Sequence, residues 1–550
     1  MIGNKSGVKM GKLYYNGKII TMAEPSEAQK LVTEAVYVSD GYIRKVGSME
    51  MVCKDLPEST EYVDLQGQCL MPSFIDAHSH IVMNGQMSQT VDLSECNSFQ
   101  DIIDKLKSYI AEHGITQKDI VIGYGYDHNF LKEQRHPDKY VLNQSDDLIP
   151  IMITHISGHL CCVNQALLNL AGIDESTRNP TGGCIGRLEG SNEPDGYLEE
   201  GAIAFLQSVI QDRLKVSVKS ILENMQDVYV KNGITTVQDG ATTGNDMAIL
   251  KQMSKSGMLK VDVVCYPLIS ANGAELVTQN KEFDNQYSGN LKIGGYKIIL
   301  DGSPQGKSAW LSAPYEDGSQ YCGYPYYEDK VLEQYVMQAL DDKKQILAHC
   351  NGDAASEQFL KVYEKCLEKT SQSSDLRPVM IHCQTVRKDQ LKRMAKINMI
   401  ASFFVGHVWY WGDVHLKNLG QKRGMNISPV KDAINLGVKY NFHQDTPVTK
   451  PNMLHSIWCA VNRISRKGRI IGESQKISVY DALKAVTINA AYEYFEEKEK
   501  GSIEAGKKAD MVILSQSPLE TDVKQIKNIQ VIETIKNGET VYNFVNKSVS

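Results

Sequence analysis

Between residues 71 and 443, short apolar segments alternate with longer segments of amphipathic helical periodicity. This alternation is typical of βα units, in which parallel strands lie side by side and helices cover them. The predicted strands are residues 71–75, 120–123, 149–154, 235–239, 261–266, 295–301, 345–349, 379–382, 399–404 and 438–443. The predicted helices are residues 98–112, 217–232, 328–341 and 354–366. The pattern therefore predicts an α/β protein, and the strand count fits a (β/α)8 TIM barrel with an insertion around residues 85–210.

Both ends of the chain have the composition of short antiparallel strands. Residues 12–22 carry an Asn-Gly pair, residues 35–46 carry Ser-Asp-Gly, and residues 529–544 carry a second Asn-Gly pair. Such dipeptides between alternating apolar residues favour β-hairpins. We therefore expect residues 1–70 and 500–550 to form one small composite β-sandwich, and residues 71–499 to form the barrel.

Composition narrows the class of protein. A hydrophobic content of 42% and a charged content of 23% are typical of globular proteins. The net charge of −7 gives no basic patch, so we expect no nucleic-acid partner. Twelve cysteines without regular spacing indicate reduced thiols. We see neither a signal peptide nor an apolar run of membrane-spanning length, and expect a cytoplasmic protein without a membrane partner. Nothing fixes the oligomeric state, for which a homodimer is one option.

Two histidines one residue apart, His78 and His80, end the run MPSFIDAHSHI. In a strand, residues i and i+2 point to the same side, so both imidazoles would leave one face together. Two neutral imidazoles at a strand end can chelate a divalent metal such as zinc. An isolated pair of this kind also arises by chance, so its meaning depends on the other strand ends.

Four further polar residues follow or lie within predicted strands: Lys297, His349, His382 and Asp445. In βα barrels the chemistry takes place where strands end and loops begin. Taken singly, a histidine there is more often hydrogen-bonded packing, and an aspartate before Thr-Pro is usually a turn former. A lysine inside an apolar strand is different, because burying an unpaired ammonium is costly. Lys297 either pairs with a carboxylate such as Asp301 or reacts with carbon dioxide to become a carbamate.

These residues, in this order, resemble the amidohydrolase superfamily. Finer features resemble its amidohydrolase 3 group, whose members include N-substituted formamide deformylases. The similar stretches are GYGYDHNFL at 123–131, HISGHLCCVNQALL at 155–168, DGSPQGKSAWLSAPY at 301–315, AHCNGDAA at 348–355, HVWYWGD at 407–413, HQDTPVTKP at 443–451 and KGSIEAGKKADMVIL at 500–514.

The resemblance implies a distorted (β/α)8 barrel, a β-sandwich built from both termini, and a site for one or two zinc ions. The metal ligands that it implies are His78, His80, Lys297, His349, His382 and Asp445. Lys297 is at the position that is carboxylated in binuclear members. The chain departs from the family pattern at Ile381, where many relatives carry an acidic residue, and at His443, where several carry glycine.

The resemblance also implies a mechanism and a small-molecule substrate. A metal would acidify water and polarise the scissile carbonyl group, and Asp445 would accept the proton and pass it to the leaving nitrogen. His159 is the second candidate catalytic residue, as a donor to the carbonyl oxygen. The candidate substrate-binding residues are His155, Gln305, His407, Trp411 and His443. The aromatic segment 407–413, which we expect to be a barrel-mouth loop, favours an apolar or aromatic substrate.

Three functions remain open at this point. The first is hydrolysis of the carbon–nitrogen bond of a small N-substituted amide. The second is deamination, or hydrolysis of a lactone or ester, since the same site can direct water at any of these centres. The third is a non-catalytic binding protein, which the retention of all six ligands disfavours. The fold alone does not decide among them.

Overall fold

The computed structural model describes residues 11–24, 31–87, 90–156, 158, 160–180, 183–213, 218–370 and 375–544. The chain divides into two compact units, each described here by itself. Unit 1 comprises residues 1–82 and 226–550, and unit 2 comprises residues 83–225. Across the described residues, no helix has the combination of length and apolar character that crossing a membrane requires.

Two parallel sheets occupy the centre of unit 1. The first has the order β17-β16-β15-β8 and is formed by β8 (Phe74–Ile75), β15 (Ile234–Thr242), β16 (Asp262–Pro267) and β17 (Leu291–Ile293). The second runs in chain order through β18 (Gly295–Ile299), β19 (Gln345–Cys350), β20 (Val379–His382), β21 (Ile400–Phe403) and β22 (Tyr440–Phe442). The predicted α/β class is therefore confirmed. The ladders among the described residues form two sheets and do not close a barrel.

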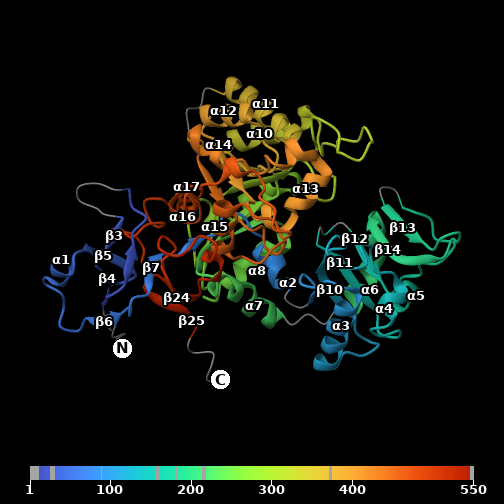
Figure 1. The fold of residues 1–550 in the computed structure, drawn as a ribbon, viewed down its shortest axis with the longest axis horizontal. Coiled ribbons are helices and arrows are strands. Elements are labelled where there is room, and N and C mark those ends of the chain that lie inside the picture. The colour runs from blue at the N-terminus through green and yellow to red at the C-terminus, as the bar shows by residue number, and fades with distance from the viewer. Residues whose placement is uncertain are drawn as a thin grey trace. The chain divides into compact units, whose positions relative to one another are not determined.

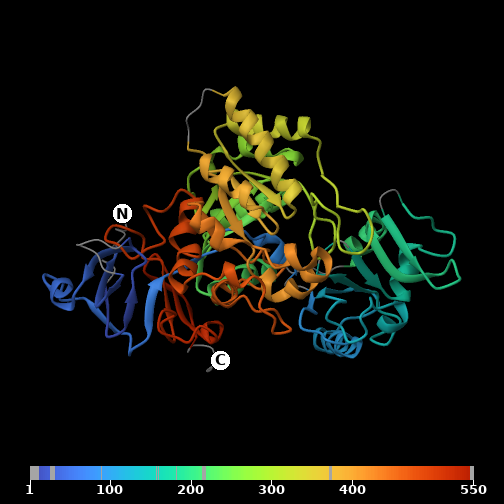
Figure 2. The ribbon, with the colours of Figure 1, turned by 45° about the horizontal axis from the view of Figure 1, so that its top comes forward.

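These strands are almost entirely buried, because helices cover them. The helices are α8 (Gly244–Lys255), α9 (Gly273–Gln279), α10 (Asp329–Asp341), α11 (Asp353–Lys369), α12 (Lys388–Lys396), α13 (His407–Gly424), α14 (Val430–Asn435), α15 (Met453–Asn462), α16 (Val479–Ala485) and α17 (Ile488–Glu493). Figures 1 and 2 show α10, α11 and α12 together on one side of unit 1. The predicted helices at 328–341 and 354–366 are confirmed as α10 and α11.

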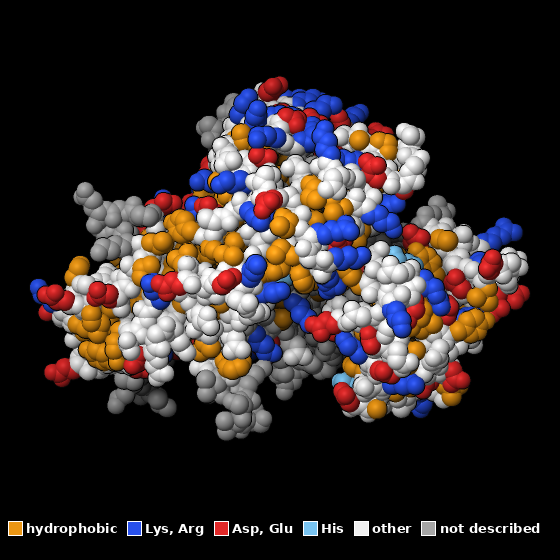
Figure 3. Space-filling view, in the orientation of Figure 1, with side chains coloured by type: hydrophobic (Ala, Val, Ile, Leu, Met, Phe, Trp, Pro, Cys, Tyr) orange, Lys and Arg blue, Asp and Glu red, His pale blue; other side chains and the backbone are white. Residues whose placement is uncertain are grey.

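Charged side chains on these outer helices pair with one another. Arg393 of α12 contacts Glu364 of α11 at 2.7 Å, and Lys361 of α11 contacts Asp329 of α10 at 2.9 Å. On the face drawn in Figure 3, basic and acidic side chains are interspersed over this region. Exposed ion pairs of this kind contribute roughly 0–1 kcal/mol each to folding stability. The helices are therefore held in place mainly by their buried faces.

Strands from both ends of the chain pair in one sheet. Its order is β25-β24-β23-β7-β2-β3, formed by β2 (Lys18–Ile20), β3 (Val32–Thr33), β7 (Cys69–Pro72), β23 (Met511–Leu514), β24 (Val531–Lys536) and β25 (Glu539–Asn543). A second sheet, ordered β5-β4-β1-β6, contains β1 (Lys12–Tyr15), β4 (Ala35–Ser39), β5 (Tyr42–Gly47) and β6 (Glu61–Asp64), with α1 (Met49–Cys53) after β5. Tyr14 and Val36 of the second sheet share a core cluster with Ile19 and Met511 of the first. Figures 1 and 2 show the blue and red strands side by side.

Two of the three predicted hairpins are confirmed, and one is wrong. β4 pairs with β5 around Ser39-Asp40-Gly41, and β24 pairs with β25 around Asn537-Gly538. The Asn16-Gly17 turn instead sends the chain from one sheet to the other, because β1 pairs with β4 and β6 while β2 pairs with β3 and β7. A Cβ at Gly17 would lie 2.5 Å from the carbonyl oxygen of Gln68. The segment that contains Gln68 therefore packs directly against the turn.

The predicted strand at 71–75 is two strands. It breaks at Ser73, whose N–H donates to the carbonyl oxygen of Asp510, whereas the next N–H, of Phe74, donates to Gly233. β7 therefore belongs to the sheet of the two termini, and β8 belongs to the parallel sheet.

A buried ion cluster joins the C-terminal strands to the parallel sheet. Asp262, the first residue of β16, contacts Lys500 at 2.5 Å and Lys536 of β24 at 2.9 Å, and Lys536 also contacts Asp510 at 2.9 Å. Each of these four side chains is less than 5% exposed. Because both lysines are paired, their charges are compensated away from water.

Unit 2 has its own sheet and its own core. The sheet has the order β13-β14-β12-β11-β10-β9 and consists of β9 (Val91–Asp92), β10 (Val121–Tyr126), β11 (Ile151–His155), β12 (Leu160–Val163), β13 (Gly183–Arg187) and β14 (Pro194–Glu200). The helices are α3 (Phe99–His113), α4 (Lys139–Asn143), α5 (Gln165–Ala171) and α6 (Gln207–Arg213), while α2 (Ile81–Met87) and α7 (Val218–Val230) cross the boundaries between the units. α3 and α7 confirm the predicted helices at 98–112 and 217–232.

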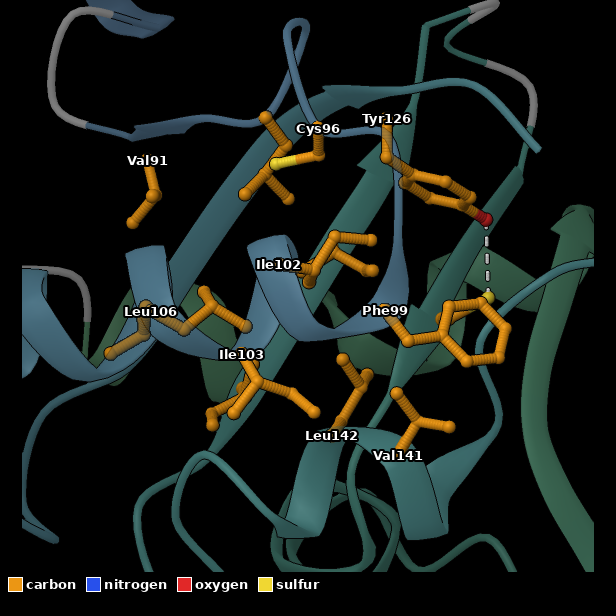
Figure 4. Packing of buried hydrophobic residues seen from close by; sticks show 14 of the residues in the cluster. Val91, Cys96, Phe99, Ile102, Ile103, Leu106, Tyr126, Val141 and Leu142 are labelled. Atoms are coloured by element: carbon orange, nitrogen blue, oxygen red, sulfur yellow. Dashed lines mark hydrogen bonds between the residues drawn. The ribbon is translucent and has the colours of Figure 1, made fainter. Parts of the chain in front are cut away.

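The core of unit 2 explains why α3 lies where it does. Its apolar residues Phe99, Ile102, Ile103 and Leu106 share one side of the helix and pack in a buried cluster, which also takes in the Tyr126 ring of β10 (Figure 4). The Tyr126 hydroxyl group lies 3.2 Å from the Cys162 sulfur. The helix begins after Ser98, whose side chain accepts from the Asp101 N–H, and ends at Gly114 in the left-handed conformation.

Candidate metal centre

The two histidines of the H-x-H pair lie just beyond the end of β8. His78 and His80 lie after the strand, so the alternation of side chains within a strand does not set the directions of the two imidazoles. The segment after Ile75 bends, and His80 forms an isolated bridge with Asp239. Backbone hydrogen bonds hold this segment against the segment after β22, since Asp445 N–H donates to His78 oxygen and His80 N–H donates to Thr446 oxygen. The two imidazoles still converge, with ring centroids 5.0 Å apart.

The other predicted ligands lie at or near the carboxyl ends of the second parallel sheet. Lys297 is within β18, His349 is within β19, His382 ends β20, and Asp445 follows β22. Because these strands are parallel neighbours, their carboxyl ends meet at one edge. Residues that are far apart in the sequence thereby reach the same place.

Asp445 lies at the centre of the cluster. Its Oδ1 lies 3.3 Å from Nε2 of His78 and 3.2 Å from Nε2 of His80, and its Oδ2 lies 3.9 Å from Nε2 of His382. His78, His382 and Asp445 each place one potential ligand atom within 4.8 Å of the others. These three residues form the innermost group of the predicted six.

Lys297 and His349 complete the group. Nζ of Lys297 lies 3.1 Å from Nε2 of His78, and the His349 ring lies 4.4 Å, centroid to centroid, from the His382 ring. Asp301, the carboxylate proposed as a partner of Lys297, contacts His349 instead. The structure therefore brings all six predicted ligands into one set of contacts.

Two of the ligands have an unusual backbone conformation. His382 has φ 77° and Asp445 has φ 54°, in the left-handed region that non-glycine residues seldom adopt. Such a conformation costs of order 1–3 kcal/mol and persists only where surrounding contacts impose it. Here it turns both side chains to the shared side of the sheet edge.

Burial disfavours the protonated forms of His78 and His382. It lowers the pKa of His78 and of His382 well below the usual value, and the neighbouring Lys297 and His349, respectively, lower it further. The pKa of Asp445 is also lowered, because His382, His80 and His78 outweigh the burial that would raise it. Neutral imidazoles and an ionised carboxylate are the protonation states that bind a divalent metal.

Gln238, in the middle of β15, holds His78 in orientation. Nδ1 of His78 donates to Oε1 of Gln238 at 2.5 Å, which leaves Nε2 directed at Asp445 and Lys297. The Gln238 side-chain amide in turn donates to the Ala77 carbonyl oxygen at 2.7 Å. An outer hydrogen bond of this kind fixes the tautomer and the ring of a metal-binding histidine. Sequence reasoning missed Gln238, although a glutamine in an apolar strand was a usable signal.

Asp301 plays the same part for His349. Its Oδ1 lies 3.2 Å from Nδ1 of His349 and accepts from the Asn351 N–H, while its Oδ2 accepts from the N–H groups of Gly352 and Trp310. The carboxylate therefore holds two loops together, those that follow β18 and β19.

The structure also corrects one element of the predicted substrate-binding group. Residues 407–413 are the first turns of helix α13, not a loop. His407 and Trp411 face each other across 4.5 Å, and both rings contact Phe404, whose ring lies 5.3 Å from that of His443. Phe404, His407 and Trp411, which we call the aromatic group, thus lie next to His443 and the metal-ligand cluster.

The remaining predicted residues lie elsewhere or outside the described residues. His443 is fully buried and lies 5.2 Å from His78 and 5.1 Å from His382, ring to ring. Gln305 is in the loop after β18, where its backbone oxygen accepts from Asn418. His155 belongs to unit 2, and His159 lies outside the described residues, so their predicted roles stay predictions.

The cluster has the donor set and the unsatisfied atoms that a metal site requires. Oδ1 of Asp445 and Nδ1 of His382 are buried and have no hydrogen-bond partner among the described residues. A buried polar atom without a partner costs about 1–3 kcal/mol, which a coordinated cation would offset. Mixed nitrogen and oxygen donors are the set that zinc and similar ions prefer. The residues present therefore fit a divalent metal.

Known proteins are similar to this chain along most of its length. The amidohydrolase family matches residues 61–542. The protein YtcJ of Bacillus subtilis (strain 168), named as an amidohydrolase, is 28% identical over 97% of this chain and 99% of its own length. The N-substituted formamide deformylase of Arthrobacter pascens is 24% identical over 94% of this chain and 96% of its own.

A solved structure has a similar fold. The crystal structure of an uncharacterized metal-dependent hydrolase from Pyrococcus horikoshii OT3 superposes with a TM-score of 0.73, at 24% identity, covering 93% of this chain and 99% of that one. The family match spans most of the chain, including every residue of the cluster described above. The chain therefore belongs to the amidohydrolase family.

Proposed function

We propose that this amidohydrolase cleaves the amide bond of a small N-substituted amide, with N-substituted formamides as its preferred substrates. The observation that carries the proposal is the contact of one carboxylate, Asp445, with three imidazoles at the edge of a parallel sheet. The formamide preference is supported by the similarity to the deformylase of Arthrobacter pascens along almost the whole chain.

Zinc is the metal that we propose for this site. His78, His80, His349, His382 and Asp445 would hold it, and Lys297 would join them as a carbamate. When bound, a zinc ion supplies a Lewis acid that acidifies water and polarises a carbonyl group. The carbamate forms when the neutral Lys297 amine adds to carbon dioxide and releases a proton. Burial favours the neutral amine, since it lowers the pKa of Lys297 to about 8.

Asp445 is the proposed acid and base. Its ionised carboxylate can accept a proton from the attacking water and return it to the leaving nitrogen, so that amide and water become a carboxylic acid and an amine. The side chains of Asp445, His80 and His349 are 14%, 19% and 19% exposed, whereas those of His78 and His382 are at most 3% exposed. Substrate therefore approaches from the side of Asp445, His80 and His349.

The aromatic group provides the proposed substrate contacts. Phe404, His407 and Trp411 present ring surfaces next to His443, and rings of this kind bind apolar substituents by area burial and stacking. We assign the amine substituent of the substrate to this side.

We further propose that the two parallel sheets are parts of one (β/α)8 barrel. Its strands would be β8, β15, β16, β18, β19, β20, β21 and β22. Support comes from the parallel bridge between Leu268 and Lys297 at one junction, and from the hydrogen bonds between the segments after β8 and β22 at the other. The shared core of the two terminal sheets supports a β-sandwich.

The test is a comparison of substrates with the zinc-loaded full-length protein. We would measure kcat/KM for N-alkyl and N-aryl formamides, the matching acetamides, N-acyl amino acids, aminopurines and lactones. We expect the formamides with apolar substituents to be cleaved most efficiently, with formate and amine released in equal amounts. A higher kcat/KM for an aminopurine or a lactone than for every amide would refute the proposal.

A further inference from the structure

A second cluster of potential metal ligands lies in unit 2. Asp127 and His128 are the first residues after β10, and His155 is the last residue of β11. β10 and β11 are parallel neighbours, with Tyr126 opposite His155. The carboxyl ends of two adjacent strands therefore present two imidazoles and a carboxylate at the same place.

The spacing of the three donor atoms fits a divalent ion. Nδ1 of His128 lies 3.2 Å from Nε2 of His155, and Oδ1 of Asp127 lies 3.6 Å from His155 Nε2 and 3.9 Å from His128 Nδ1. Ligands bonded to zinc at about 2.0–2.1 Å in a tetrahedron are separated from one another by about 3.3–3.4 Å. The three separations bracket that value without any rearrangement of the backbone.

Neighbouring groups hold the three side chains in place. The Asn129 N–H and its side-chain amide both donate to Oδ1 of Asp127 at 2.9 Å. The His136 ring lies 4.1 Å from the His128 ring, and Nδ1 of His136 is hydrogen-bonded to the Tyr126 hydroxyl group at 3.0 Å. Outer contacts of this kind orient metal ligands and leave them little freedom to lose on binding.

The three side chains of this cluster differ in how much of their surface is exposed. The side chains of Asp127 and His155 are 7% and 8% exposed, and that of His128 is 31% exposed. An ion can therefore reach the donors from solvent on the His128 side, while two of the three donors are shielded from water. Three protein ligands leave at least one coordination position for water or a small ligand.

We propose that Asp127, His128 and His155 form a second metal site, which binds a divalent first-row transition ion such as zinc. Two imidazoles and one carboxylate are the donors that zinc and iron(II) share, whereas magnesium and calcium prefer oxygen donors alone. All three ligands belong to unit 2, so that unit supplies the whole donor set by itself. It gives His155 a role other than the predicted one in substrate binding.

The test uses full-length protein in which the proposed ligands of unit 1 are removed by His78→Asn and His80→Asn. After equilibration with zinc chloride and removal of free zinc, we expect one zinc ion per chain. Adding His155→Gln or Asp127→Asn should abolish this binding. Adding His113→Gln, which changes an exposed histidine of α3 that stacks on Tyr109, should leave it unchanged. Magnesium chloride in place of zinc chloride should give no bound ion.

Two results would overturn the proposal: absence of zinc from the His78→Asn/His80→Asn protein, or zinc that persists after His155→Gln in protein with an unchanged circular dichroism spectrum. If His155→Gln does not fold, His128→Gln at the partly exposed position makes the same test. The outcome is separable from that for unit 1. Equal zinc content with and without His78→Asn/His80→Asn would refute a metal in unit 1 and leave this site standing.

Discussion

Oδ1 of Asp301 lies 3.2 Å from Nδ1 of His349, near the end of β19. The same oxygen accepts a hydrogen bond from the Asn351 N–H, just after that strand. The other ring nitrogen, Nε2, lies 3.3 Å from the side-chain amide nitrogen of Asn351, and the His349 ring lies 4.4 Å from the His382 ring, centroid to centroid. A carboxylate in this position raises the basicity of a metal-binding imidazole as well as orienting it.

Asp301→Asn should therefore weaken zinc binding, by roughly 10–100-fold, because loss of an outer carboxylate has effects of that size. A competition titration with a chromophoric chelator measures the affinity. Asp353→Asn is the matched control, since Asp353 also accepts a backbone N–H, from Ser312, and pairs with Arg387 away from the ligands. We expect the control to lower the unfolding temperature and to leave zinc affinity unchanged. Equal zinc affinity of Asp301→Asn and wild type would contradict the assignment.

Gly240 packs directly against the His78 ring. An added Cβ would lie 2.4 Å from Cε1 of His78 and 2.7 Å from its Nδ1, so the ring or the strand must move. Gly240→Ala should displace His78 from Gln238, weaken zinc binding and reduce kcat/KM. Gly244→Ala adds the same methyl group four residues later, where nothing lies within 4 Å. We expect that control to bind zinc and to turn over substrate as wild type does; a similar loss in both variants would show that the His78 contact is not the cause.

Asp445→Asn preserves the shape of the side chain and removes its charge and its basicity. We expect kcat to fall by about 10²–10⁴-fold, the usual contribution of a positioned acid–base group. Because neighbouring histidines hold the pKa of Asp445 well below its usual range, this carboxylate stays ionised throughout the neutral and mildly acidic range. The pH profile of the wild type should therefore show no loss from this group near pH 4–5. Full activity of Asp445→Asn would exclude the proposed proton transfer.

Asp262→Asn tests the buried ion cluster. It leaves Lys500 and Lys536 short of a partner, and breaking a buried pair costs about 3–5 kcal/mol. Burial would raise the pKa of Asp262, but the two lysines outweigh it and hold the pKa below its usual value. The stabilisation is therefore present above the unfolded-state pKa of about 3.9 and is lost as the pH falls.

Urea unfolding at neutral pH and at about pH 3, below the unfolded-state pKa, measures this effect. We expect the difference in unfolding free energy between wild type and Asp262→Asn to shrink at the lower pH. Asp227→Asn, which removes a partly exposed carboxylate paired with Lys260 at 3.1 Å, should change stability by less than about 1 kcal/mol at either pH. A pH-independent difference for Asp262→Asn would contradict the proposed charge compensation.

The elements of the fold that follow from local patterns were predictable from the sequence. The helix at 354–366 and the hairpin around residues 39–41 depend on periodicity and turn chemistry, and both are present. The Asn16-Gly17 hairpin failed because pairing partners far along the chain compete with the adjacent strand. The break at Ser73 likewise depends on hydrogen bonds to distant segments.

The metal ligands were predictable as residue types at strand ends, but their geometry was not. The left-handed backbone of His382 and Asp445 has no local sequence signal, because tertiary contacts impose it. The partner of Asp301 was also unpredictable, since Lys297 and His349 both lie within reach of its strand end and only coordinates decide between them. The aromatic residues of segment 407–413 obscure its helical periodicity. The sequence therefore predicts a loop where the structure has the first turns of α13.

All six ligands of the proposed catalytic centre come from unit 1, although the 143 positions from 83 to 225 separate His78 and His80 from the other four along the chain. Substitutions, insertions and deletions inside that interruption leave the coordinating side chains unaltered. Sequence change confined to unit 2 therefore retains every proposed ligand of the catalytic centre.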